Sequence, residues 1–136
     1  MPFEFKIDVD RRLLIATFTG EATLAEAQEL VVQLYDDPRY SSSFNRVYDC
    51  RGVTRLPPLA ELRGVAELLR RSADPAAPVR RALVVRGGAL YRVAGVLHAL
   101  LDIFSVRLDV FSNLDEAVEW ASRPGPALRS RRDPAA

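Results

Sequence analysis

The stretch RVYDCRG, residues 46–52, places an acid, a thiol and a guanidinium in consecutive positions as Asp49, Cys50 and Arg51. A catalytic cysteine needs a thiolate stabilised by a cation and a base that takes its proton. Arg51 could supply the cation, but the only histidine of the chain, His98, lies far along the sequence. We therefore predict that Cys50 is a core residue and that the chain is not an enzyme.

Asp49 and Arg51 follow an apolar run that predicts a short strand, residues 46–50, ending at the edge of a sheet where ligands of α/β proteins bind. Side chains two apart in a strand share one side, so Cys50 should face the other way. Both charged residues are candidate ligand or partner-binding residues. The structural alternative is that Asp49 accepts N–H bonds from Gly52 or Val53 and closes a turn. An enzyme centred on residues 49–51 stays as a further alternative.

The glycine pair in RGGAL, residues 86–90, predicts a tight turn between a strand and a helix. The spacing matches neither a Walker loop nor a dinucleotide-binding loop. An anion on the first N–H groups of the following helix remains open, with Arg92 nearby. One cysteine and one histidine cannot form a zinc site, so we expect no metal and no cofactor.

The helix expected over residues 89–104 is apolar around most of its circumference, which is a wider arc than a sheet can cover. Part of that surface should meet a neighbouring helix, a second subunit, or an apolar ligand or lipid. Leu97 and Leu101 lie on this apolar arc and are candidate ligand- or partner-binding residues. His98 is expected to pair with Asp102 one turn later. Tyr91, His98 and Asp102 form a narrow polar stripe on this helix.

The rest of the chain supplies the elements that would position these residues. Thr23 and Glu26 have the spacing of a capping box, which predicts a helix beginning at Leu24. Asn113 and Glu116 mark the start of the last helix in the same way. The expected elements are an opening hairpin over residues 3–18, helices over 24–35, 59–71, 89–104 and 114–121, and strands over 46–50, 79–85 and 106–111.

Strands that alternate with helices predict parallel pairs joined by right-handed crossovers. The predicted fold is α/β, a five-stranded mostly parallel sheet with an N-terminal antiparallel hairpin and four helices on both faces. We expect one domain over residues 1–122 and a disordered tail over 123–136, which has early prolines and several arginines but no apolar periodicity.

Composition narrows the classes of partner. The 136 residues carry 19 Lys plus Arg against 18 Asp plus Glu, so no broad positive field exists for nucleic acid. The amino terminus lacks the pattern of a signal peptide, and no apolar run is long enough to cross a bilayer. We expect a cytoplasmic protein with no transmembrane segment.

Several phrases together carry a family resemblance: FTGEAT after the hairpin, RVYDCRGV, ALVV followed by YRVAGVL, and VFSNLDEAVEWA near the end. Over about residues 3–122 the chain resembles the SpoIIAA-like proteins of the STAS/SEC14-type fold. These are single-domain bacterial proteins related in architecture to the anti-sigma-factor antagonists. In the phosphorylated antagonists an Asp-Ser pair before the second helix takes phosphate from a kinase. Here that stretch, VTRLPPLAEL, contains only Thr54 as a hydroxyl residue, so no phosphorylation site is expected.

The resemblance implies a non-enzymatic binding or regulatory module that acts through protein contacts, as a homodimer or with another protein. The SEC14 side of the resemblance implies an alternative, a carrier or sensor of an apolar small molecule or lipid bound near the third helix.

Overall fold

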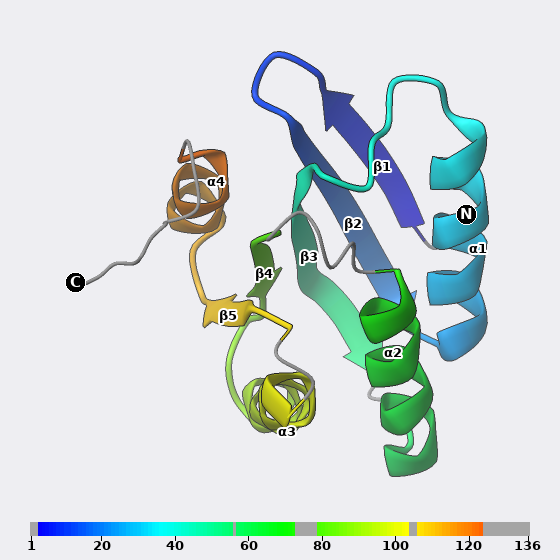
Figure 1. The fold of residues 1–136 in the computed structure, drawn as a ribbon. Helices are drawn as coiled ribbons and strands as arrows, with labels where there is room; N and C mark the ends of the chain where they lie inside the picture. Colours follow the sequence, from blue (N-terminus) through cyan, green and yellow to red (C-terminus); the bar gives the residue numbers. More distant parts are fainter. Residues whose placement is uncertain (1–2, 56, 73–78, 104–105, 124–136) are drawn as a thin grey trace.

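The structure, a computed structural model, describes residues 3–55, 57–72, 79–103 and 106–123. These residues form five strands and four helices in the predicted order (Figure 1). The strands are β1 (Phe3–Asp8), β2 (Leu13–Glu21), β3 (Asn45–Arg55), β4 (Arg81–Val84) and β5 (Leu108–Phe111). The helices are α1 (Leu24–Asp36), α2 (Leu59–Arg71), α3 (Ala89–Ile103) and α4 (Leu114–Ser122).

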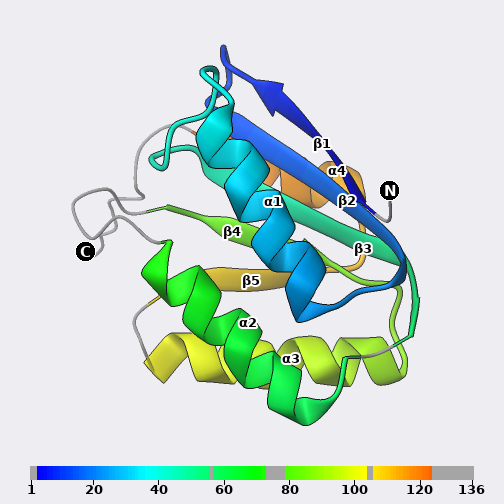
Figure 2. The same ribbon diagram turned by 90° about the vertical axis from the view of Figure 1, so that its right-hand side faces the viewer.

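The strands lie in the sheet in the order of the chain, β1-β2-β3-β4-β5. β1 and β2 are antiparallel, and the other three pairs are parallel. Because each crossover moves one strand further in the same direction, right-handed connections place α1, α2 and α3 on one face. α4 covers the other face (Figures 1 and 2). The predicted fold class is confirmed.

Local signals in the sequence fix the ends of two helices as predicted. The Thr23 hydroxyl oxygen accepts the N–H of Glu26, and the Glu26 carboxylate accepts the N–H of Thr23, so the capping box is formed. The Asn113 side-chain oxygen accepts the N–H of Glu116 at the start of α4. These bonds satisfy N–H groups that have no partner inside a helix.

Two contacts join the start of α1 to α2. The N–H of Leu24 donates to Glu61 Oε1 at 3.0 Å. A Cβ at Gly64 would lie 2.6 Å from Leu24 Cδ2, so the absence of a side chain at Gly64 lets the helices approach closely. α2 in turn contacts α3, and the three helices form a row across one face of the sheet (Figure 2).

β3 is longer than the sequence predicts. Its pairing with β2 continues to Glu21 and Arg55, through an irregular register between Thr17 and Thr19. Asp49 therefore lies within the strand, and the expected strand end at residue 50 is wrong. Asp49 is nevertheless the last β3 residue paired with β4, which is a much shorter strand. The expected tail lies, from residue 124, outside the described residues.

The two faces of the sheet have separate cores. On the α4 face, small side chains such as Ala82, Ala117 and Ala121 are wholly buried and bring the helix close to the strands. On the face of α1, α2 and α3 the apolar residues form two clusters, one under α1 and one under α2 and α3. Tyr48 and Cys50 of β3 pack against both clusters and lie between them.

Candidate functional site: an apolar cavity closed by a buried arginine

A cavity of about 150 Å³ lies between the sheet and the row of helices. Nearly all of its lining is apolar and comes from three helices and the strands beneath them. Among the residues that line it are Leu30, Leu34, Leu62, Leu69, Ala94 and Leu97 from the helices and Tyr48, Cys50 and Leu83 from the strands. A space of similar volume in an apolar core can hold a benzene molecule.

One end of the cavity is polar. Arg46, the second residue of β3, lines it, although only 3% of this residue is exposed to solvent. Its Nη2 donates to the carbonyl of Ser42 at 3.1 Å and more weakly to the carbonyl of Ser72 at 3.4 Å. The guanidinium carbon lies 5.7 Å from the centre of the Tyr40 ring. A buried cation is therefore part of the mostly apolar wall of this cavity.

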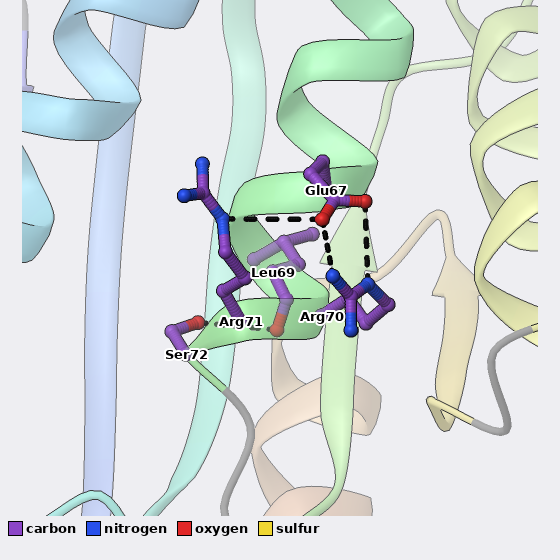
Figure 3. Close-up of polar contacts among 5 residues, drawn as sticks. All are labelled: Glu67, Leu69, Arg70, Arg71 and Ser72. Atoms are coloured by element: carbon purple, nitrogen blue, oxygen red, sulfur yellow. Dashed lines mark hydrogen bonds and ion pairs between the residues drawn. The ribbon is translucent and has the colours of Figure 1, made fainter.

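The end of α2 forms part of this polar wall. The Ser72 hydroxyl donates to the carbonyl of Leu69, which bonds the first residue after α2 to the last turn of that helix (Figure 3). Glu67 forms ion pairs with Arg70 and Arg71 on the exposed side of the same helix (Figure 3). These three charges are thus paired at the surface of α2, while Leu62 and Leu69 line the cavity.

Asp49 and Arg51 form an ion pair away from this cavity. Arg51 Nε and Nη2 donate to the two carboxylate oxygens of Asp49, each at 2.9 Å, and the N–H of Arg51 donates to Oδ1 at 3.1 Å. These bonds lower the pKa of Asp49, against the opposing effect of its burial. The shared side of the two residues is confirmed, but the N–H that Asp49 accepts is that of Arg51 rather than of Gly52 or Val53.

Cys50 points to the opposite side of β3 and lines the cavity. Burial, with a smaller contribution from the charge of Asp49, raises the pKa of the thiol to about 12. Burial disfavours a thiolate because the charged form loses its hydration. Cys50 is therefore a neutral wall residue at physiological pH.

The third helix divides its predicted contact residues between the core and the surface. Leu97 and Leu101 are buried beneath α3, and Leu97 also lines the cavity. Tyr91 and Arg92 are exposed at the first turn. The apolar arc that reaches solvent is centred elsewhere, on Val96 and Ile103.

His98 is held by a backbone contact. Its Nδ1 donates to the carbonyl of Leu108 at 2.5 Å, which ties α3 to β5. The expected pairing with Asp102 is wrong: within the described ranges the only hydrogen bond of the ring goes to Leu108. The carbonyl of Leu108, the first residue of β5, takes the ring N–H instead.

The cavity and its arginine were missed in the sequence, although a signal was present. Arg46, Tyr48 and Cys50 are spaced two residues apart in the strand, so their side chains share one face of the sheet. That face carries α1, α2 and α3. An arginine at a position that the strand pattern assigns to the buried face indicates a buried cation. Asp49 and Arg51, the candidates that the sequence offered on this strand, lie on its opposite side.

The described ranges lack the residues for two other classes of site. They contain no group of three or more acidic, histidine or cysteine side chains placed to hold a metal ion. None of their helices combines the length and apolar character that crossing a membrane requires. Neither a protein-family model nor a curated protein matches this chain. The site must therefore be interpreted from its geometry.

Proposed function

We propose that this chain is a binding module for a small, largely apolar molecule, held in the cavity between the sheet and α1, α2 and α3. The observation that carries the proposal is the cavity itself, about 150 Å³ of space with an almost wholly apolar lining. Ligand sites are usually concave, mostly apolar and provided with a few polar groups that orient the ligand. The cavity has this composition, with Arg46 and Tyr48 as polar groups on its wall.

The chemistry of the wall favours binding over catalysis. A nucleophile needs activation by a base or a lowered pKa, and Cys50 has a raised pKa instead. The alternation along β3 places the Asp49–Arg51 ion pair on the opposite side of the sheet from the cavity. A carrier or sensor of an apolar molecule is the function that follows.

Native mass spectrometry of the full chain, purified from cells without organic solvent, tests the proposal. We expect a population of protein that carries one additional small molecule, released by mild collisional activation. In parallel, titration of ligand-free protein with hexan-1-ol, followed by NMR, should shift resonances of cavity residues such as Ala94 and Leu97. A chain that carries nothing from cells and does not respond to hexan-1-ol is not a binder of apolar molecules.

A second candidate is a module that acts by forming a homodimer. It rests on the exposed edge of α3, where Val96 and Ile103 are 43% and 75% exposed. Exposed apolar side chains that share a helix edge are typical of protein contacts. Sedimentation of the wild type and of Ile103→Glu tests it: a dimer lost in the variant, with circular dichroism unchanged, supports the contact. A wild type that sediments as a monomer at high concentration excludes it.

A further inference from the structure

Arg46 and Arg81 are a pair of neighbouring buried cations. They are direct partners in the parallel register of β3 and β4, so their side chains lie on the same face of the sheet. That face carries α1, α2 and α3, because Tyr48 and Leu83, two residues further along each strand, pack there. The two residues are 3% and 1% exposed.

Neither guanidinium has a counter-ion within the described part of the chain, where no ion pair includes Arg46 or Arg81. Arg46 Nε and Arg81 Nε and Nη2 are buried without any hydrogen-bond partner there. A buried charge is normally paired and fully hydrogen-bonded. Two adjacent buried cations that repel each other therefore indicate a place for an anion.

Tyr48 connects the arginine pair to the apolar cavity. It lies near both guanidinium groups and lines the cavity, as Arg46 does. Burial, reinforced by the charge of Arg46, lowers the pKa of Arg81. Arg46 and Tyr48 thus belong both to the cavity wall and to the surroundings of the arginine pair, whereas Arg81 itself does not line the cavity.

We propose that the ligand is an amphipathic carboxylate whose carboxylate group binds between Arg46 and Arg81 while its apolar part fills the cavity. This inference rests on the proposed function. A guanidinium presents N–H donors in a planar fork that matches the two oxygens of a carboxylate. The volume of about 150 Å³ suits an apolar part the size of a benzene ring or a short alkyl chain.

The test compares hexanoate with hexan-1-ol, which share a chain length and differ in charge. NMR titration of the full chain near pH 7 gives both dissociation constants. We expect hexanoate to bind at least tenfold more tightly than the alcohol. Arg81→Met and Arg46→Met should each remove this preference, and Arg81→Met, at a residue that does not line the cavity, should leave binding of hexan-1-ol within about threefold of wild type. Methionine keeps the length of the side chain without its charge.

Arg80→Gln is the matched control. Arg80 neighbours Arg81 in sequence, but its guanidinium lies on the α4 side, where it donates to the carbonyl of Trp120 at 2.9 Å. This variant should keep the tenfold preference for hexanoate. Circular dichroism and thermal unfolding of each variant verify folding; if one Met variant does not fold, the other decides.

Three results would overturn the inference. Equal affinity for hexanoate and hexan-1-ol in the wild type would show that the arginines recognise no ligand anion, while the proposed function would stand. Wild-type preference for hexanoate in a folded Arg81→Met or Arg46→Met variant would do the same. Binding of neither compound would remove the inference together with the proposed function.

Discussion

Ala94→Leu should fill the cavity and stabilise the ligand-free protein. Ala94 is 2% exposed and lines the cavity, so three added carbon atoms enter existing space. Their burial is worth about 2.4 kcal/mol at about 0.8 kcal/mol per carbon. Ordering the leucine side chain costs about 0.5 to 1 kcal/mol, which leaves a gain of about 1.5 kcal/mol.

For a domain of this size the gain corresponds to a rise in Tm of about 6 °C, at roughly 4 °C per kcal/mol. Differential scanning calorimetry measures it. The same leucine should weaken the binding of hexan-1-ol at least tenfold, because it occupies the space of the ligand. The two effects have opposite signs, and the same assays report both.

Ala99→Leu is the matched control, since Ala99 lies on the exposed side of the same helix. It adds the same atoms to the surface and should change neither Tm nor binding appreciably. The reasoning is refuted if Ala94→Leu lowers Tm while hexan-1-ol binds as before, because the cavity would then offer no usable space.

Three other predictions follow from the described contacts. Leu97→Glu and Leu101→Glu should each abolish folding, since both leucines are buried, and retained helical circular dichroism would contradict this. Cys50 should not react with a thiol reagent at pH 8 in the folded protein, because burial raises its pKa to about 12; rapid stoichiometric labelling would exclude that environment. Asp49→Asn should cost at most about 1 kcal/mol near neutral pH, because solvent screens the ion pair that it makes with the exposed Arg51. This pair lowers the pKa of Asp49 in the folded protein. The stabilisation by the pair is therefore complete above the unfolded pKa near ~4 and is lost as the pH falls through the folded pKa. The free energies of unfolding of wild type and Asp49→Asn, measured by denaturation, should become equal in acid.

The order and types of the elements could be predicted because their signals are local. The capping box at Thr23 and Glu26 and the strand alternation depend on residues close in sequence. The end of β3 could not be predicted, because it is set by continued pairing with β2 as far as Glu21 and Arg55. The end of a strand depends on how far the neighbouring strand pairs with it, and the sequence of the strand alone does not show that register.

The candidate site was predicted only in part for a similar reason. The wide apolar arc of α3 correctly indicated more contacts than one sheet provides, but Leu97 and Leu101 proved to face the interior. The pairing of Arg46 with Arg81 depends on the register between β3 and β4, which joins residues 35 positions apart in the chain. No local pattern in the sequence reports that distance, and the cavity arises from how three helices meet.

The sheet separates two apolar cores, one on each of its faces. The α4 side, packed through Ala82, Ala117 and Ala121, holds the strands in register whatever occupies the opposite side. Side chains on the other side, such as Leu30 or Leu62, can therefore change in size without disturbing the packing beneath α4. Under the proposed function, substitutions on α1, α2 and α3 alone would change which molecule binds, while the scaffold that lets the chain fold stays the same.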